Sequence, residues 1–470
     1  MKAESDYNQR QKQKTVAKRE KKIISTIFER FVEQTPLTVM VRAIMERSFG
    51  KEQLEKLFEE TAEEQYTKTL LFSNVVGLMS LVVCGMYPSV GAAYQAYKKV
   101  VGVSKVALYA KINRLEPRIS QALVRYSSEQ VSAIKTEFRQ ANKSILAGYE
   151  VRIVDGNHIG GTEHRLKVLR EESAGALPGQ AIVVLDPQRE LVVDVFPSED
   201  AHAQERSLFT LILETVKAGQ VWIADRNFCT KDFLTGISER RGCFIVREHL
   251  NLKWIEITAR EEVGKNESGT IFEQQVQLDS GICVRRITIQ LEKQTRHGDW
   301  QVTVLTNLPE AEVTALVVSE LYLKRWEIEK MFQVITDTFN CELKTLGYPK
   351  AALFSFCMAL VAFNILSTVK SALKEIHGAE KIDAELSSYY VVEEVQSTFR
   401  GMEVAIESEE WAYFSEMTVT TFADMLRTWA AKVNLKRFLK SPRGKKKPQK
   451  KKTYDPKHPH LSTFRLLSAQ

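Results

Sequence analysis

The sequence predicts a protein of the mixed α/β and α+β classes, in which helices flank a mixed β-sheet that carries a β-rich insertion. Helical periodicity through 23–148 predicts an all-α N-terminal region, and the same pattern through 350–440 predicts a helical C-terminal region. Between them, short β-branched runs bounded by Gly, Pro and Asp alternate with helical segments, which indicates a sheet with helices packed on it. Alternating polar and apolar residues within 251–300 indicate inserted hairpins.

The chain has 470 residues, enough for several structural units around at least one sizeable core. We expect a polar basic tail first, then a helical domain, a mixed α/β domain, a helical region and a second basic tail. The boundaries that composition predicts for these five units, in the same order, are 1–22, 23–148, 149–349, 350–440 and 441–470.

The net charge of +7 is concentrated near the two ends of the chain. Twelve basic residues and one acidic residue lie between Lys432 and Lys457, and eight basic and three acidic residues lie between Lys2 and Lys22. Such segments are usually solvated, and they also attract polyanions by releasing condensed counterions. The six cysteines form no C-x-x-C pair, so we expect reduced thiols rather than a disulfide framework or a zinc site.

Two apolar stretches, 70–87 and 351–369, approach the length that spans a membrane. Each contains Ser and Asn, and neither is a clean apolar run of about 20 residues. We therefore predict buried helices and no membrane association, with a membrane protein as the alternative.

The segment 92–117 has the pattern of a helix-turn-helix. A turn centred on Gly102 is followed by Ser104 as an N-cap and by a second amphipathic helix that we expect to end at Pro117. An ordinary helical hairpin fits the pattern equally well. In a DNA-binding motif, the second helix would present three side chains to a groove: Lys105, Tyr109 and Lys111.

The central segment contains strand patterns at 149–159, 180–187, 190–197, 221–228, 243–250 and 300–309. Helical patterns occupy 201–219 and 231–242. Asp155 closes the approach "VRIVD" and Asp225 closes "VWIAD". An aspartate after an apolar strand is often only a turn or cap residue. Acidic residues from separate elements are also the ligands that hold divalent metals for phosphoryl transfer on nucleic acids.

The stretch "YLKRWEIEKMFQVIT" (322–336) predicts one helix with two faces. At 100° per residue, Ile328, Met331 and Ile335 fall on an apolar side. The other side is a stripe of Tyr322, Arg325, Trp326, Glu329, Gln333 and Thr336. A surface helix with paired charges would explain the charges alone. A stacking ring, a phosphate clamp and a metal ligand would explain the aromatic residues as well.

These residues together resemble a known family. Asp155, Asp225 and Glu329, in this order and on these elements, are similar to the DDE triad of transposases with an RNase H-like core. Tyr322, Arg325 and Glu329 match the tyrosine–arginine–glutamate–lysine signature of the insertion-sequence-four family of bacterial cut-and-paste transposases. The stretches "DGNHIGGTEHRLKVLR", "ALPGQAIVVLDP" and "DAHAQERS" and the β-rich insertion also look like parts of its members.

The resemblance implies a DNA transposase of an insertion sequence. Its three acidic residues would be both catalytic and the ligands of two Mg²⁺ ions, with Mn²⁺ able to substitute. The implied partners are double-stranded DNA, as terminal inverted repeats and as target, and a second copy in a homodimer assembled through 350–440. The implied location is the bacterial cytoplasm, at the nucleoid. The side chains expected to contact DNA near the cut are Tyr322, Arg325, Trp326 and Arg226.

In one respect the chain departs from the family pattern. The signature lysine is expected seven residues after Glu329, where this chain has Thr336. In the family, a tryptophan of the insertion handles a flipped base, and Trp300 and Trp254 are both candidates here. Two other functions therefore stay open: a non-catalytic DNA-binding relic of a transposase, and an RNase H-like nuclease without strand transfer.

Overall fold

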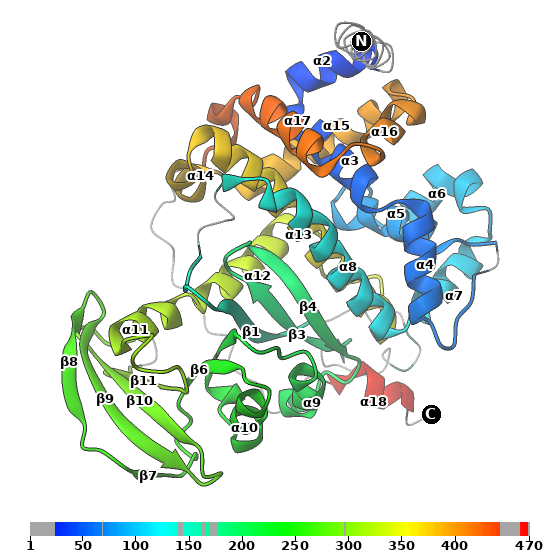
Figure 1. Ribbon diagram of the computed structural model, residues 1–470. Coiled ribbons are helices and arrows are strands. Elements are labelled where there is room, and N and C mark those ends of the chain that lie inside the picture. Colours follow the sequence, from blue (N-terminus) through cyan, green and yellow to red (C-terminus); the bar gives the residue numbers. More distant parts are fainter. Residues whose placement is uncertain are drawn as a thin grey trace, which may run out of the picture.

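The protein is represented by a computed structural model that describes residues 24–67, 69–139, 144–160, 166, 168, 176–295, 298–441 and 461–468. In these residues a ten-stranded mixed sheet has the order β4-β3-β1-β5-β6-β11-β10-β9-β7, and β8 pairs with β9 (Figure 1). Its strands are β1 (Glu150–His158), β3 (Gln180–Asp186), β4 (Leu191–Ser198), β5 (Gln220–Ala224), β6 (Cys243–Arg247), β7 (Trp254–Glu256), β8 (Glu261–Asn266), β9 (Gly269–Leu278), β10 (Cys283–Leu291) and β11 (Gln301–Thr306). This confirms the mixed sheet and the β-rich insertion.

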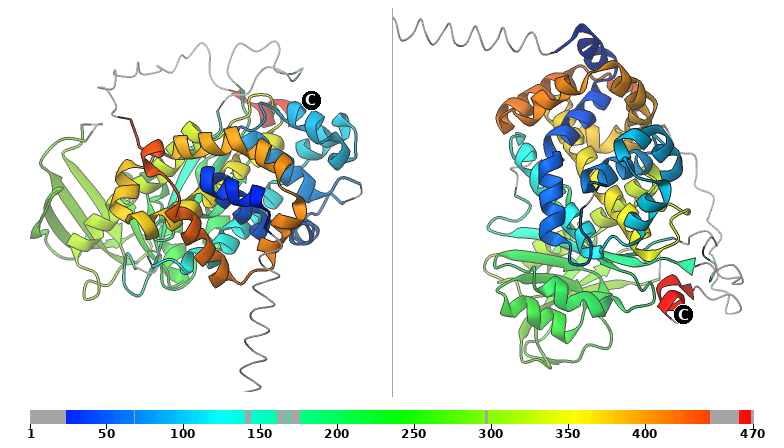
Figure 2. Two further views of the ribbon diagram at one scale, coloured as in Figure 1. Left: turned by 90° about the horizontal axis from the view of Figure 1, so that it is seen from above. Right: turned by 90° about the vertical axis from the view of Figure 1, so that its right-hand side faces the viewer.

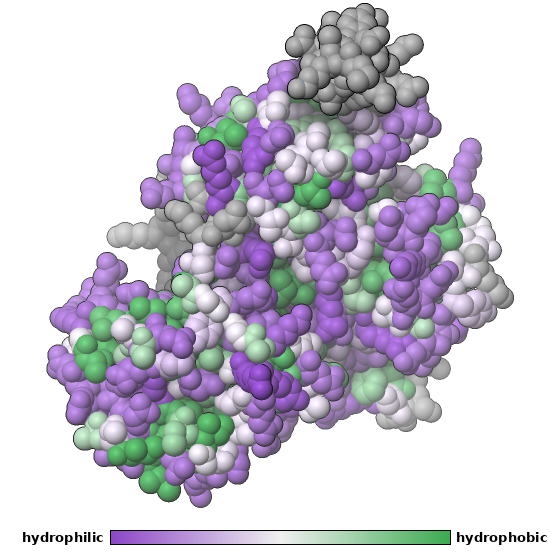
Figure 3. All heavy atoms as spheres, viewed as in Figure 1, coloured by the Kyte–Doolittle hydropathy of each residue, from purple (hydrophilic) through white to green (hydrophobic). Residues whose placement is uncertain are grey.

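The strand directions divide the sheet into two parts. β5 is parallel to both β1 and β6, whereas β3 and β4 add antiparallel strands on one side and β11 joins β6 antiparallel on the other. The insertion continues from β11 as antiparallel hairpins that project from the rest of the molecule (Figure 1). Its surface carries the exposed apolar side chains Ile255, Ile257 and Val263, and hydrophobic residues are visible there (Figure 3).

Helices cover both faces of the sheet (Figures 1 and 2). The smaller layer has α9 (Phe209–Leu213) and α10 (Lys231–Glu239) over a core that includes Trp222, Phe228 and Phe233. The larger layer has N-terminal helices α2 (Thr26–Gln34), α3 (Pro36–Ser48), α4 (Lys51–Thr61), α5 (Phe72–Val83), α6 (Val90–Val101), α7 (Lys105–Asn113) and α8 (Pro117–Thr136). It also has C-terminal helices α13 (Pro349–His377), α14 (Ala379–Glu385), α15 (Ser388–Ala405), α16 (Ser408–Ser415) and α17 (Val419–Ala431).

The N-terminal and C-terminal helices share one hydrophobic core, which extends from Phe28 to Phe438. Phe28 itself packs against Trp411 and Trp429, so α2 meets the C-terminal helices α16 and α17 in the same layer. A separate all-α N-terminal domain is therefore not visible as a core of its own, and the five domain boundaries stay predictions. The tails 1–22 and 442–460 lie outside the described residues.

Helix α13 runs through the centre of the larger layer, between α8 and the helices α3, α5 and α17. It is the one helix among the described residues that is long and apolar enough to cross a membrane, and its apolar window is 94% buried inside the protein. Asn364 on α13 accepts a hydrogen bond from the Val192 amide (2.8 Å) and donates one to the Val192 carbonyl (2.9 Å). The prediction of a buried helix is therefore confirmed. Its polar residue Asn364 is satisfied inside the protein by the backbone of the edge strand β4.

The segment 92–117 forms the expected pair of helices. α6 ends at Gly102, which has the left-handed φ of 68°, and the Ser104 hydroxyl accepts a hydrogen bond from the Ala107 amide as the N-cap of α7. α7 ends earlier than expected, at Asn113, and Pro117 instead starts α8. Helix-turn-helix and helical hairpin both remain compatible with this geometry.

Two other local expectations were wrong. The strand expected at 221–228 ends at Ala224, because Asp225 caps a 3₁₀ turn, η4 (Arg226–Phe228). The helix expected at 201–219 is a 3₁₀ turn, η3 (Glu205–Leu208), followed by the short α9.

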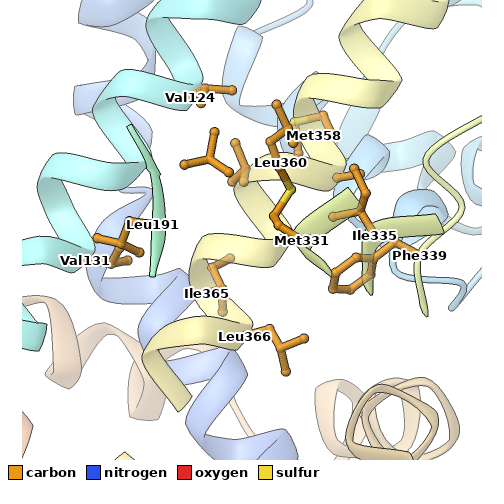
Figure 4. Close-up of a cluster of buried hydrophobic side chains, with 14 of the residues drawn as sticks. Val124, Val131, Leu191, Met331, Ile335, Phe339, Met358, Leu360, Ile365 and Leu366 are labelled. Carbon is orange, nitrogen blue, oxygen red and sulfur yellow. The ribbon is translucent and has the colours of Figure 1, made fainter. Parts of the chain in front are cut away.

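The helix expected over 322–336 is two helices, α11 (Ala315–Leu323) and α12 (Trp326–Thr338). They separate because α11 packs against the insertion strands β8, β9 and β10, whereas α12 packs against α13 and α15. On α12, Met331 and Ile335 point toward Met358 and neighbouring residues of α13 (Figure 4). The apolar face predicted for this helix is therefore confirmed at Ile328, Met331 and Ile335.

The packing of α12 leads to a prediction about stability. Met331→Ala should lower the free energy of unfolding by about 2–5 kcal/mol, because Met331 is only 2% exposed and its loss leaves a cavity against α13. Lys330→Ala, at the exposed neighbouring position, should change it by less than about 0.5 kcal/mol. Denaturant unfolding measures both variants, and a loss for Met331→Ala no larger than that of the control would contradict this packing.

Candidate functional site

Asp155 and Asp225 lie side by side because of the register of two parallel strands. Val154 on β1 pairs with Ala224 on β5, and each aspartate is the next residue along its strand. Neighbouring strands are about 4.8 Å apart, so the two carboxylates lie close together at the level where β5 ends. Asp155 Oδ1 accepts a hydrogen bond from the Gly156 amide, and Asp225 Oδ1 accepts one from the Asn227 amide. Asp225 is thus also the N-cap of η4, and Asp155 Oδ2 is left to contact Arg325.

Arg325 connects this edge of the sheet to α12. Its Nη2 atom lies 2.7 Å from Glu329 Oε1, and its Nη1 atom lies 3.5 Å from Asp155 Oδ2. The arginine side chain is mostly buried. Two of the three acidic residues that the sequence singled out are therefore held around one cation, and the third, Asp225, adjoins Asp155.

The electrostatics of Asp155 show how crowded these charges are. Burial raises its pKa most, the negative charge of Asp225 raises it further, and the Arg325 guanidinium opposes both, with a resulting pKa of about 7. A buried carboxylate beside a like charge prefers to hold a proton. Asp155 therefore changes its charge near neutral pH unless a cation binds beside it.

Tyr322 and Trp326 flank Arg325 in different ways. Tyr322 was expected on an exposed stripe but is only 8% exposed, because α11 packs it into the core and its hydroxyl interacts with Arg325. Burial raises the pKa of Tyr322. Trp326 is 48% exposed, and the guanidinium carbon of Arg325 lies 4.8 Å from the centre of its ring. Tyr322 thus contacts Arg325 from the core side, and Trp326 contacts it from the solvent side.

Arg226 and Trp300 lie where the insertion approaches the site. Asp299 Oδ2 is 2.8 Å from Arg247 Nη2 and 3.9 Å from Arg226 Nη2, so the loop before β11 is tied to the residue after Asp225. Trp300, the next residue after Asp299, is 54% exposed.

Trp254, the other candidate for handling a flipped base, is already engaged within the insertion. Its indole N–H donates a hydrogen bond to Glu248 (2.9 Å), and the Arg286 guanidinium carbon lies 4.9 Å from the centre of its ring. Of the two tryptophans weighed from the sequence, Trp300 is therefore the more accessible one, and its neighbour Asp299 contacts the residue after Asp225.

Helix α7 lies away from this site. Figures 1 and 2 place α6 and α7 on the opposite side of the molecule from the β-insertion. Lys105 is exposed and Tyr109 is partly buried. Lys111 turns back onto the protein, where its ammonium lies 4.0 Å from the centre of the Phe58 ring and donates to the Tyr66 carbonyl. Any DNA contact by these three residues would be separate from the acidic site.

At position 336, where the resemblance led us to expect a lysine, the threonine side chain bonds locally. The Thr336 hydroxyl donates to the Phe332 carbonyl (2.8 Å), and Gln333 donates to Asp337 (3.1 Å). Both lie on the exposed side of α12. The stripe therefore continues past Glu329 with neutral side chains.

One carboxylate that sequence reasoning missed belongs to this neighbourhood. Glu205, the first residue of η3, influences the charge state of Asp155 and is itself influenced by Asp225. Its only sequence signal is that it lies within the stretch "DAHAQERS".

Within the described residues, no three acidic, histidine or cysteine side chains stand close enough to hold a metal ion as they are placed. Glu329 is turned toward Arg325 rather than toward Asp225. The donor chemistry nevertheless suits Mg²⁺, which prefers carboxylate oxygens, and the crowding at Asp155 is relieved by a bound cation.

The raised pKa of Asp155 predicts that removing its charge stabilises the protein, and more so at higher pH. Its folded pKa of about 7 lies above the ordinary value of 3.8, so the metal-free protein loses stability as the pH rises between these two values. Asp155→Asn has no proton to lose. In chelator, its melting temperature should exceed that of the wild type by at least about 2 °C near pH 8, and the gain should shrink toward pH 4.

Asp279→Asn is the matched control, because it removes the same charge at an exposed position. Its melting temperature should follow that of the wild type at every pH. A gain in melting temperature for Asp155→Asn that does not grow with pH would show that the surroundings of Asp155 do not disfavour its charged form.

The comparisons with known proteins point to one family. Residues 146–365, which include all three acidic residues, match the model described as "Transposase DDE domain". No curated protein matches the chain. A solved piggyBac transposase synaptic complex with hairpin DNA is similar at a TM-score of 0.39 and 9% identity, over 90% of each chain, which is too distant to carry an argument. Residues 146–365, somewhat less than half of the chain, are thus similar to a transposase DDE domain.

Proposed function

We propose that the chain is the transposase of an insertion sequence, which cuts the element's ends by metal-dependent phosphoryl transfer and joins them to target DNA. The observation that carries this proposal is the contact of Arg325 with both Asp155 and Glu329, with Asp225 adjoining Asp155 through strand register, inside the region that matches the DDE domain. The parallel strands β1, β5 and β6, with antiparallel β3 and β4 at one edge, support an RNase H-like core of the insertion-sequence-four type.

The three acidic residues, all oxygen donors, are the ligands we assign to two Mg²⁺ ions, with Mn²⁺ as a substitute. When bound, these ions supply an activated water or 3′-hydroxyl and stabilise the leaving oxygen. Asp155 and Asp225 are already adjacent, and Glu329 needs to turn away from Arg325 to join them.

That rotation gives Arg325 a role on the substrate. Once Glu329 leaves it, the guanidinium is free to bind a DNA phosphate through paired N–H donors. Tyr322 holds the arginine from the core side, and the exposed ring of Trp326 lies where the DNA strand would pass. Arg226 is partly exposed, and its one ion pair within the described ranges is the 3.9 Å contact to Asp299, so it too can reach the DNA backbone.

A basic pocket beside the acidic site supports DNA as the substrate. It has a volume of about 370 Å³ and adjoins the turn after Asp225, and its charged lining residues are Arg206, Lys231 and Lys253 with one acidic residue, Asp279. In the described part of the chain, none of these three cations forms an ion pair, and all three are exposed. Unpaired cations in a concave surface attract the phosphates of a nucleic acid.

The proposal extends to the partner and the location of the protein. Cutting two ends of one element calls for two active sites, so we propose a homodimer on DNA with its contact within 350–440. We also propose the bacterial cytoplasm, at the nucleoid, as its location, which the proposed DNA substrate and the family resemblance support.

The two other functions differ from the proposal in their products. A nuclease on the same core would cut DNA with Mg²⁺ but would give no strand-transfer product. A non-catalytic relic would bind DNA without cutting it, and Thr336 in place of the signature lysine is the feature that favours it. Incubating the wild type with Mg²⁺ and the DNA that flanks its gene separates all three.

Glu329→Gln should reduce single-turnover cleavage of that flanking DNA by about 10³-fold or more, because a lost metal ligand removes several kcal/mol of transition-state stabilisation. Glu327→Gln is the control on the same helix, where the glutamate pairs with Lys324 at the surface. It should cut at a rate close to that of the wild type. Equal cleavage by Glu329→Gln and the control would remove Glu329 from the site.

Replacing the pocket cations should weaken binding to DNA of any sequence alike. Lys231→Gln and Lys253→Gln together should lower the slope of log affinity against log salt by about 2. Lys381→Gln, an exposed lysine on α14, is the control and should leave the slope unchanged. Fluorescence anisotropy with labelled duplexes at several salt concentrations measures both slopes, and equal slopes would exclude the pocket from the DNA path.

A further inference from the structure

Arg247 stands beside Asp225 in the row of parallel strand ends. Asp225 directly follows β5, whose last residue pairs with Val246 on β6, and Arg247 is the next residue of β6. Paired positions on neighbouring strands point to the same face of a sheet and are about 4.8 Å apart. Burial raises the pKa of Tyr322 most, and of the charges that act on it, Arg325 and Arg247 lower it and Asp225 raises it. Arg247 and Asp225 therefore both face this tyrosine.

A single carboxylate oxygen of the insertion faces two arginines here. Asp299 Oδ2 lies 2.8 Å from Arg247 Nη2 and 3.9 Å from Arg226 Nη2. The Thr295 hydroxyl donates a hydrogen bond to the same oxygen at 3.3 Å. Within the described residues, neither arginine has a second ion pair. Two positive charges thus share one negative charge, which belongs to the protein itself.

The surroundings of Asp299 are those of an anion-binding site. Guanidinium groups bind carboxylate and phosphate oxygens with the same fork of N–H donors. The side chains of Asp299 and Arg226 are 37% and 44% exposed, so an anion from solvent can reach them. β6 is the neighbour of β5 in the sheet, so a DNA strand that lies across Asp225 would continue over Arg247.

We propose that Arg247 and Arg226 form a subsite for a DNA phosphate beside the acidic residues, and that Asp299 fills this subsite in the DNA-free protein until a phosphate displaces it. The inference rests on the DNA substrate proposed above. It adds Arg247, which the sequence did not single out, to the side chains that contact DNA. Trp300 is the next residue after Asp299, so the displacement also frees the backbone beside its exposed ring.

A purely structural ion pair between Asp299 and Arg247 makes a different prediction. If the pair only ties the insertion to β6, breaking it from either side weakens DNA binding in the same direction. If Asp299 competes with phosphate, the two substitutions have opposite effects. Arg247→Gln removes a phosphate contact, whereas Asp299→Asn removes the competitor and leaves both arginines to the DNA.

The measurement is fluorescence anisotropy of the full-length protein with a labelled duplex of the DNA that flanks its gene, in chelator. Arg247→Gln should raise the Kd about tenfold or more, the loss expected for a charge-assisted hydrogen bond. Asp299→Asn should lower the Kd about threefold or more, because the arginines no longer have to give up an internal partner. In the Arg247→Gln background, Asp299→Asn should bring no more gain than a charge control, since the two side chains act on one subsite.

The charge controls are Lys293→Gln and Glu267→Gln, at exposed positions of the same insertion. They measure what the loss of one charge alone does to the Kd, and melting curves check that each variant is folded. Should Arg247→Gln not fold, Arg247→Lys keeps the charge without the paired donors and should raise the Kd about threefold or more.

The outcomes separate this inference from the proposed function, because binding in chelator does not depend on cleavage. Weaker binding by Asp299→Asn, or a gain no larger than that of Glu267→Gln, would overturn the competition by Asp299. Binding by Arg247→Gln equal to that of Lys293→Gln would remove Arg247 from the DNA path. Either result leaves the proposed function intact when the wild type binds and cuts the DNA. A wild type that does not bind duplex DNA would overturn both proposals.

Discussion

The contact of Arg325 with Glu329 and Asp155 is the interaction on which the rest of the site depends. It joins Asp155 on β1 to the start of α12, across 170 residues of the chain. One cation that contacts both carboxylates lets the metal-free protein keep them together. The same arginine rests on Trp326 and is fixed by Tyr322, so its position is set on both sides. Substrate and metal would then compete with this internal ion pair.

The scaffold behind this contact is helical. α12 carries Arg325 and Glu329 at its start and buries Met331 and Ile335 against α13 (Figure 4). α13 in turn holds the edge of the sheet through Asn364 and the Val192 backbone. The position of Glu329 relative to Asp155 is therefore set by packing on α13 at one side and by strand register at the other. A cavity under α12 would disturb the site without touching a charged residue.

Much of this arrangement follows from sequence patterns, and the rest depends on tertiary contacts. An aspartate at the end of each of two apolar strands indicated Asp155 and Asp225, because parallel strands bring such ends together. The periodicity of 322–336 indicated the buried face of α12. It did not indicate the break before Trp326, which arises because α11 and α12 pack on different partners and which puts Tyr322 inside the protein. Glu205 could not be found by pattern, since it lies on a short 3₁₀ turn and its carboxylate comes close to Gly156 of β1 only in the folded chain.

The most direct test of the account is to locate manganese in crystals of the protein by anomalous scattering. The account predicts a peak between Asp155 and Asp225, about 2.1 Å from carboxylate oxygens, with Arg325 no longer paired to Glu329 when DNA is also bound. Manganese bound only elsewhere, with Arg325 still bridging Asp155 and Glu329 at saturating metal, would contradict it.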